Sequence, residues 1–570
     1  MKPVRLPASA TRALPRWGLF ALCLLYILPG LIGRDPWKNE DAAGFGIMWT
    51  MAHGVWQDWL MPNIVGLPMT QDGPLTFWIG AVCIKLFGWA LGEPIAARIG
   101  TIAFFLIGAL SVWYAAYLLG RRNEAQPLRL AFGGQPEAKD YGRTLADGAL
   151  LIYLGCLGLL AHSHTTSAAA LNVSMVGFSL YAAARYFENY SLRAAMVLGL
   201  ALGLLALSRN WITPVALWLG LATFGLMRRD GALKQLLLAT LPTALLVGAS
   251  WWLALHFAQS REPETIADWL AASQRQIGLP TIETIKFFIV NGIWFAWPAW
   301  PYALWAVYAW RKQSMALHIA LPFVFCNVLA VLMVLNPQSA EHILLPLLPA
   351  LAILAAFGLP TMKRGAINAV DWFSVMTMSA VAAFIWLGWI AKQTGWPEQL
   401  AKNAFKLAPG FKPEFNLLAV IVAVLASVGW VWLVHWRIAR RPSVLWRAVV
   451  LSSGGVILCW LLLMTLWLPW GNYVRSYVTV ADQLELKLPK NMDCVESNVG
   501  PAQRASFAYF GHVRFAPAGK QCDFLLLQDS NRKKNDARLI HRSGQQWRLL
   551  WEGRRPADRD ERFRLYQRVD

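Results

Sequence analysis

The sequence predicts an α-helical polytopic membrane protein with about 13 transmembrane helices and a small α/β domain at its C-terminal end. Composition is the first reason: 57% of the 570 residues are apolar and only 15% are charged, whereas a soluble domain carries about 25% charged residues. The apolar residues also fall in runs of about 20, which span a bilayer as helices. Hydrocarbon offers backbone amides no partner, so spanning segments must be helices or closed barrels.

Basic residues set the expected orientation of these spans. The net charge of +20 would suggest nucleic acid binding in a soluble protein. Here Lys and Arg gather in short loops, as is typical of the cytoplasmic side of a membrane protein, so we expect no nucleic acid partner. The clusters are Lys2 to Arg16, Arg121-Arg122, Arg228-Arg229, Arg311-Lys312, Lys363-Arg364 and Arg437 to Arg441.

The first apolar run, 17–32, follows a basic N-terminus and is therefore expected to start in the cytoplasm. It resembles a signal peptide, but no small-residue cleavage site follows, so we interpret it as a retained helix. Residues 74–90 allow two counts. If these residues span the membrane, the Arg121-Arg122 pair lies outside. If they form an interfacial helix, the pair lies inside, on the same side as the other basic clusters.

The second count gives an odd number of spans and places the C-terminus outside. The remaining spans are expected near 95–119, 143–161, 166–187, 193–208, 211–227, 235–257, 287–310, 315–335, 343–360, 370–391, 415–436 and 446–468. Residues 1–470 thus form a transmembrane domain, in which 34–94 are a first outer loop with interfacial helices. Residues 471–570 form the outer α/β domain.

The composition becomes polar and mixed after Trp470. Residues 476–488 are predicted to form an amphipathic helix. Short apolar or alternating runs predict strands at 508–515, 524–527, 547–551 and 563–567. Cys494 and Cys522 lie here, on the side expected to be oxidising, and are candidates for a disulfide; two buried thiols are the alternative.

The outer loops collect polar residues that could carry chemistry. Glu40 and Asp41 follow the first span closely. They are either part of a solvated acidic loop, or a general base with a second carboxylate that orients an acceptor or a cation. Arg209 and Asn210 lie between two apolar runs, where Arg209 either snorkels to the interface or binds a phosphate through paired hydrogen bonds.

Further candidates share the same outer face. His162 and His164 are either interfacial residues or a two-histidine metal site. A divalent cation stays open as a cofactor, with unknown ligands. The other candidates are Gln71 and Asp72 in the first loop, Arg261 and Arg275 in the loop 258–286, and Glu341 and His342 before a later apolar run.

Residues 34–122 together resemble the bacterial glycosyltransferase 39 family, which includes protein O-mannosyltransferases and lipid A aminoarabinose transferases and has the GT-C fold. The similarity rests on an acidic pair after the first span, here Glu40-Asp41, followed by a Trp, Pro and Gly pattern, KLFG at 85–88 and AAR at 96–98. The sequence departs from the family in three places. The acidic pair is Glu-Asp here, which reverses the family's order. Asp72-Gly73 stands where the family has Lys-Pro. Ala169 lies in the stretch after the third span where the family usually has an acidic residue.

The resemblance implies a glycosyltransferase of the bacterial inner membrane that uses a polyprenyl-phosphate sugar donor. The acceptor would be lipid A or lipopolysaccharide, a glycolipid or a protein, and membrane lipids would be further partners. In this interpretation Glu40 or Asp41 is the base. The donor phosphate and lipid would contact Arg209, Asn210, Arg261, Arg275 and His342, and the acceptor or sugar would contact Gln71, Asp72 and Glu341.

Two other functions stay open at this point. A transporter or flippase for a lipid-linked substrate would also need many spans and a few charges among them. An internal repeat, which many transporters have, is missing, and the long first loop and outer domain favour an enzyme. The departures from the family pattern also leave open a non-catalytic member.

Overall fold

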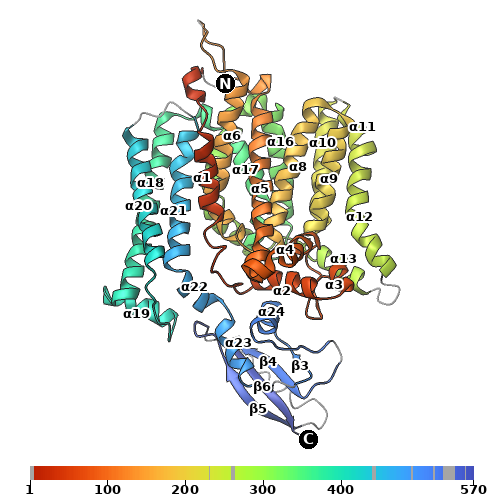
Figure 1. Cartoon of the computed structure of the whole chain (residues 1–570). Helices are drawn as coiled ribbons and strands as arrows, with labels where there is room; N and C mark the ends of the chain where they lie inside the picture. Colours follow the sequence, from red (N-terminus) through yellow and green to blue (C-terminus); the bar gives the residue numbers. More distant parts are fainter. Residues whose placement is uncertain are drawn as a thin grey trace.

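A computed structural model describes residues 5–131, 133–229, 231–258, 264–439, 445–489, 492–517, 520–530, 546–558 and 560–569. The protein is a bundle of lengthwise helices with a small sheet at one end, and its two termini lie at opposite ends (Figure 1). The helices of the bundle are α1 (Arg16–Ile27), α5 (Glu93–Gly120), α6 (Ala138–Gly155), α8 (Ala168–Asn189), α9 (Leu192–Ser208), α10 (Ile212–Arg228), α11 (Ala232–Gln235), α12 (Leu241–Ala258), α14 (Ile282–Phe295), α15 (Ala299–Trp310), α16 (Leu317–Val334), α17 (Leu347–Ala356), α18 (Arg364–Thr394), α20 (Leu417–Ala439) and α21 (Val450–Leu466).

Within the described ranges, five segments are long and apolar enough to cross a membrane: Glu93–Gly120, Ala232–Ala258, Leu317–Val334, Gly365–Thr394 and Leu417–Arg437. A sixth results if α21 and α22 (Leu468–Arg475), which are bent by 74°, count as one span. The count of about 13 stays a prediction. Prolines explain part of the difference, because Pro298 separates α14 from α15, and Pro346 and Pro360 bound α17.

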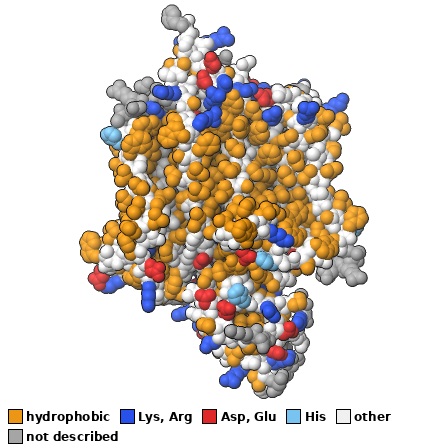
Figure 2. All heavy atoms as spheres, in the orientation of Figure 1, with side chains coloured by type: hydrophobic (Ala, Val, Ile, Leu, Met, Phe, Trp, Pro, Cys, Tyr) orange, Lys and Arg blue, Asp and Glu red, His pale blue; other side chains and the backbone are white. Residues whose placement is uncertain are grey.

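Charge is distributed along the bundle as the sequence predicts. Hydrophobic side chains cover its middle, and Lys and Arg gather at the end where the N-terminus lies (Figure 2). We call this the basic end and the opposite end, which carries the sheet, the site end. The described basic clusters fall at the basic end because they follow α5, α10 and α15 and precede α18.

Short helices complete the site end (Figure 1). Residues 74–90, the predicted interfacial helix, form α4, which packs against α2 and α5. The short helices are α2 (Glu40–His53), α3 (Trp56–Leu60), α4 (Leu75–Leu91), α7 (Leu157–His162), α13 (Glu264–Gln274) and α19 (Glu398–Leu407). Between α3 and α4, β1 (Asn63–Ile64) and β2 (Leu67–Pro68) form a hairpin.

The C-terminal segment contains α23 (Val478–Glu485), α24 (Pro501–Phe510) and the strands β3 (Val495–Ser497), β4 (Phe524–Ser530), β5 (Gln546–Gly553) and β6 (Glu561–Val569). The strand order is β3-β4-β6-β5, with β3 parallel to β4 and the other pairs antiparallel. The helix over 476–488 and three of the predicted strands are confirmed. The strand predicted at 508–515 is wrong, because these residues complete α24 and enter a loop that makes a single isolated bridge to the sheet, between Phe515 and Val495.

A disulfide between Cys494 and Cys522 joins the chain before β3 to the chain before β4, with the two Cα atoms 5.6 Å apart. The C-terminal segment also packs directly on α2. Gly46 faces Ala505 so closely that any side chain at 46 would overlap its Cβ atom. Arg504 donates hydrogen bonds to the carbonyls of Ile64 and Val65 and so holds the β1–β2 hairpin against α24.

Candidate functional site

A cavity of about 410 Å³ opens at the site end and collects residues from six separate parts of the chain. It brings together six of the residues that the sequence analysis singled out. These are Glu40, Gln71, Asp72, Arg209, Arg275 and His342. The polar part of the lining thus contains two carboxylates, two guanidinium groups and an imidazole, and side chains such as Ile47, Met69 and Phe77 form an apolar part.

Glu40 begins α2 and points into this cavity. Asn39 before it has a φ of 71° and a ψ of −127°, a conformation outside the left-handed helical region that glycine adopts more readily than other residues. A carboxylate in a first helical turn interacts favourably with the helix dipole. Oε1 of Glu40 lies 2.8 Å from Nδ1 of His342, which comes from the loop between α16 and α17. We call these two residues the Glu40–His342 pair.

Electrostatics keep Glu40 ionised. Burial alone would raise the pKa of its carboxyl, but the hydrogen bond and charge of His342, together with the charge of Arg209, lower this pKa to about 2. A carboxylate that stays charged at neutral pH can hold the imidazole with Nδ1 protonated. Nε2 of His342 is then free to accept a proton.

Arg209 lies at the end of α9 and forms an ion pair with Asp72, with Nε 3.3 Å from Oδ1. Burial raises the pKa of the Asp72 carboxyl, although Arg209 and His342 oppose the rise. Gly73 makes this contact geometrically feasible, because a side chain there would overlap the carbonyl oxygen of Leu207. The residue that replaces the family's lysine thus neutralises the arginine expected to bind phosphate.

Asn210 has a different setting from its neighbour. Its Oδ1 accepts hydrogen bonds from the amide and the hydroxyl of Thr213 and so caps α10, and its Nδ2 donates to Gln276 at 2.6 Å. It lines a smaller cavity of about 60 Å³, which shares Arg209 and His342 with the main one. Its polar groups are therefore already paired in this structure.

Asp41 does not line the cavity and is buried at 4% exposure. One of its oxygens contacts Arg34 at 3.1 Å and Arg98 at 3.3 Å, and the other accepts the Thr166 amide at 2.9 Å. Adjacent residues on a helix point about 100° apart, and here Glu40 faces the cavity while Asp41 faces Arg34 and Arg98. Asp41 instead ties the start of α2 to α5 and to the turn before α8.

The remaining candidates do not line the cavity or fall outside the described residues. Glu341 is exposed and lines neither cavity. His162 packs against Phe295 and is close enough to the site to interact electrostatically with Glu40, Arg209 and His342. His164 is buried with its ring nitrogens at the carbonyls of Leu160 and Tyr26. Arg261 falls outside the described residues. Among the residues that are described, no group of three or more His, Cys, Asp or Glu side chains is arranged to hold a metal ion.

Comparison with known proteins shows the fold. No family model matches the sequence, and no curated protein does. The crystal structure of ArnT from Cupriavidus metallidurans bound to undecaprenyl phosphate superposes with a TM-score of 0.65 at 14% identity, over 96% of this chain and 97% of that one. The apo structure of the same protein gives the same TM-score and coverage at 15% identity. This chain has the GT-C fold.

An archaeal oligosaccharyltransferase from Archaeoglobus fulgidus also matches, with a TM-score of 0.45 at 11% identity over 87% of this chain and 63% of that one. The GT-C fold that the resemblance of residues 34–122 predicted is thus confirmed by the two ArnT superpositions. In this GT-C chain the cavity lies where the first outer loop, the α9–α10 turn and the α16–α17 loop meet.

An apolar groove of about 430 Å³ adjoins this part of the GT-C fold. It runs between α9, α10 and α12 and is closed at one end by Trp251, Trp252 and Trp269. Leu207 and Trp211, which flank Arg209 in sequence, line it. The polar cavity and the apolar groove therefore meet at the turn that carries the arginine.

Sequence reasoning missed several residues of the site. Ser167, Gln276 and Gln338 line the cavity and add neutral hydrogen-bonding groups to its charges. The pairing of Arg98 with Asp41 was also missed, although the AAR pattern contains this arginine. Gln276 and Gln338 are far from Glu40 in the sequence. No sequence pattern indicated that these three side chains line the same cavity.

Proposed function

We propose that this protein is an integral-membrane glycosyltransferase, which moves a sugar from a polyprenyl-phosphate donor to an envelope acceptor at the site end. The observation that carries the proposal is one cavity that holds both the Glu40–His342 pair and the cations Arg209 and Arg275. Glycosyl transfer needs these two functions side by side: a proton acceptor for the nucleophile and positive charge for the departing phosphate.

The apolar groove supports a lipid-linked donor. A polyprenyl tail needs an apolar surface that continues from the polar site, and the groove meets the cavity at Leu207 and Trp211. With the tail between α9, α10 and α12, the phosphate would come to Arg209. The ArnT structure with the same fold contains undecaprenyl phosphate, which supports this class of donor.

The reaction that we propose is a single displacement. The acceptor's hydroxyl or amine attacks the anomeric carbon, a new bond forms there, and the bond between that carbon and the phosphate oxygen breaks. The nucleophile's proton passes to Nε2 of His342 while Glu40 stabilises the resulting imidazolium. The departing phosphate keeps the electron pair and is stabilised by Arg209 and Arg275. Such a step inverts the anomeric centre.

Asp72 adds a condition to donor binding. It pairs with Arg209, so the phosphate would have to share or displace this partner. Asp72 lines the same cavity as the Glu40–His342 pair, where it could contact the sugar or the acceptor. The outer side of the bacterial inner membrane is the compartment in which a lipid-linked donor is available after transfer across the bilayer.

Mass spectrometry of lipid A, glycolipids and envelope proteins from cells with and without the gene tests the activity. We expect one acceptor class to gain the mass of one sugar only when the wild-type protein is present. Glu40→Gln and His342→Gln should each lower transfer by about 100-fold or more, the usual loss when a general base is removed. The matched control, Glu398→Gln on the exposed face of α19, should keep wild-type transfer.

The double variant distinguishes a paired mechanism from two independent roles. Residues that act as one unit give non-additive losses, so the combination of Glu40→Gln and His342→Gln should be no slower than the slower single variant. Wild-type transfer by both single variants would contradict the proposed chemistry. Movement of an unmodified lipid-linked substrate without any glycosylated product would point to a transporter instead.

A further inference from the structure

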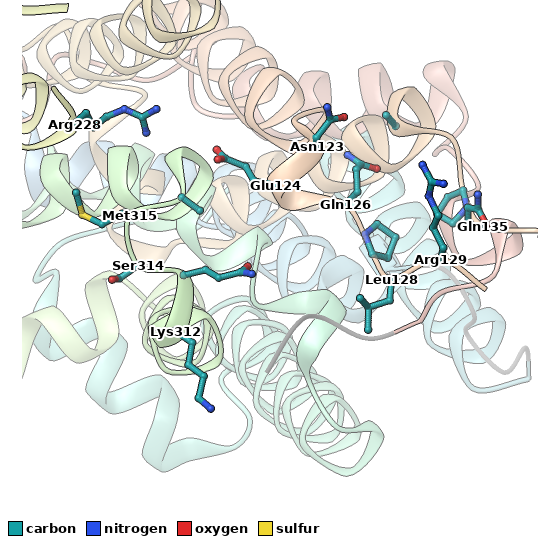
Figure 3. A pocket seen from close by; sticks show the side chains of 15 residues that line it. Asn123, Glu124, Gln126, Leu128, Arg129, Gln135, Arg228, Lys312, Ser314 and Met315 are labelled. Carbon is teal, nitrogen blue, oxygen red and sulfur yellow. The ribbon is translucent and has the colours of Figure 1, made fainter. Parts of the chain in front are cut away.

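A large cavity lies at the basic end, far from the proposed active site. It is a broad hollow of about 1070 Å³ between the chain after α5, the end of α10 and the turn before α16 (Figure 3). We call it the basic hollow. The helix α5 separates the two regions, because it begins near α2 and its 28 residues extend about 42 Å to Gly120.

Polar side chains dominate the lining of the basic hollow. Three of them are cationic, Arg129, Arg228 and Lys312, and one is acidic, Glu124. The neutral polar groups are Asn123, Gln126, Gln135, Gln313 and Ser314. The lining therefore offers many hydrogen-bond donors together with an excess of positive charge.

The single carboxylate is already compensated. Oε1 of Glu124 accepts a hydrogen bond from Nε of Arg122 at 3.0 Å and from the amide of Leu317 at 2.8 Å, at the start of α16. Arg129 and Lys312, in contrast, form no ion pair with any residue in the described parts of the chain, and both are exposed. Unlike Arg34 and Arg98, which pair with Asp41, these two cations have no carboxylate partner among the residues that the structure describes.

We infer that the basic hollow is a binding site for a phosphate-bearing anion. Guanidinium and ammonium groups bind phosphate oxygens through charge-assisted hydrogen bonds, and the amide side chains would hold polar groups attached to the phosphate. A hollow of this volume accommodates more than an inorganic ion, since ligand sites span about 300–1,000 Å³.

Two kinds of molecule can present a phosphate group to the basic hollow. The hollow lies at the ends of α5 and α10 and at the start of α16, which is where the headgroups of anionic phospholipids would meet the protein. If the basic end faces the cytoplasm, soluble phosphorylated metabolites also reach it. Both sources present the same group to Arg129 and Lys312.

The full-length protein in neutral detergent, titrated with pyrophosphate by isothermal calorimetry, tests the soluble source. The same protein in nanodiscs of phosphatidylglycerol or phosphatidylcholine, analysed by native mass spectrometry, tests the lipid source. We expect saturable binding of pyrophosphate, or selective retention of phosphatidylglycerol. The double variant Arg129→Gln/Lys312→Gln should weaken this binding at least about tenfold.

Two further double variants sharpen the result. The variant Arg12→Gln/Lys363→Gln removes the same charge from the basic end outside the hollow and should change affinity by no more than about twofold. The variant Arg129→Lys/Lys312→Arg keeps both charges and should retain most of the binding. Absence of both kinds of wild-type binding, or equal loss in the two charge-removing double variants, would overturn the inference.

Discussion

Asp41 is enclosed by Arg34, Arg98 and the turn at Thr166, so its removal should affect folding before chemistry. We expect Asp41→Asn to lower the free energy of unfolding by about 3–5 kcal/mol, because two buried guanidinium groups would lose their carboxylate. Thermal unfolding of the purified protein in detergent measures this change. Glu40→Gln is the matched control, since its side chain is 45% exposed and its loss leaves no buried cation unpaired. Equal stability of the two variants would contradict the assignment.

The destabilisation caused by Asp41→Asn should depend on pH. Burial would raise the pKa of Asp41, but Arg34, Arg98 and two backbone amides lower it overall. A carboxyl whose pKa is depressed in the folded state stabilises the fold above its unfolded pKa, near 3.9, and loses that contribution as the pH falls below it. The stability gap between wild type and Asp41→Asn should therefore be constant from pH 8 to about pH 5 and narrow in stronger acid.

The pKa of Asp72 is raised, whereas that of Asp41 is lowered, so protonation of Asp72 should have a favourable effect instead of an unfavourable one. Because burial raises the pKa of its carboxyl, Asp72 takes up a proton at a higher pH than an ordinary aspartate and then releases Arg209. Binding of undecaprenyl phosphate, followed by intrinsic tryptophan fluorescence, should tighten as the pH is lowered. Asp72→Asn should bind about tenfold more tightly at pH 7 and lose this part of the pH dependence. Weaker binding by this variant would show that Asp72 helps to hold the ligand.

For individual residues, the sequence predicted many of the side chains that line the cavity, but it did not predict how these side chains are paired. It left open which of Glu40 and Asp41 faces the cavity. Which one faces it depends on Arg34 and Arg98, whose positions follow from the packing of α1, α2 and α5. The partnership of Glu40 with His342 depends in the same way on the docking of two distant loops.

At the scale of elements, the disulfide between Cys494 and Cys522 is the main covalent constraint on the sheet, since it joins the chain just before β3 and just before β4. The two cysteines are 28 positions apart. A loop of this size contributes roughly 3 kcal/mol in the chain-entropy model. We expect the variant Cys494→Ser/Cys522→Ser to expose the C-terminal segment to protease several times faster than wild type, measured by limited proteolysis. The control Cys23→Ser, outside this segment, should leave the rate unchanged; equal protection of all three proteins would contradict a stabilising role.

The helices and strands show where local sequence patterns were sufficient to predict the structure. Apolar runs predicted most of the bundle helices to within a few residues, because a helix in a membrane satisfies its own backbone. The spans predicted at 143–161 and 287–310 are wrong as single helices, because the first is broken between α6 and α7 and the second between α14 and α15. The run at 508–515 failed, because Pro501 favours a helix start, and Ala502, Ala505 and Ala508 then form one buried face of α24. That face is chosen by contact with α2, which no local pattern contains.

For the whole molecule, the basic end should face the cytoplasm and the sheet should face outward. The described basic clusters at one end and the opposite positions of the termini support this orientation. A fluorescent reporter that matures only in the cytoplasm should be dark when fused after Asp570 and bright when fused before Met1. A bright C-terminal fusion would mean that the number of spans is even.

The close packing of Gly46 against Ala505 has a practical consequence for building chimaeras. One side of α2 supplies Glu40, Ala43 and Ile47 to the cavity, and another side carries α24. Exchange of residues 471–570 alone with those of a similar protein would graft a foreign surface onto this helix. In a working chimaera, α2, the β1–β2 hairpin and the C-terminal segment must therefore come from the same protein. We expect hybrids whose junction lies upstream of Glu40 to assemble, and hybrids whose junction lies at Trp470 to fail.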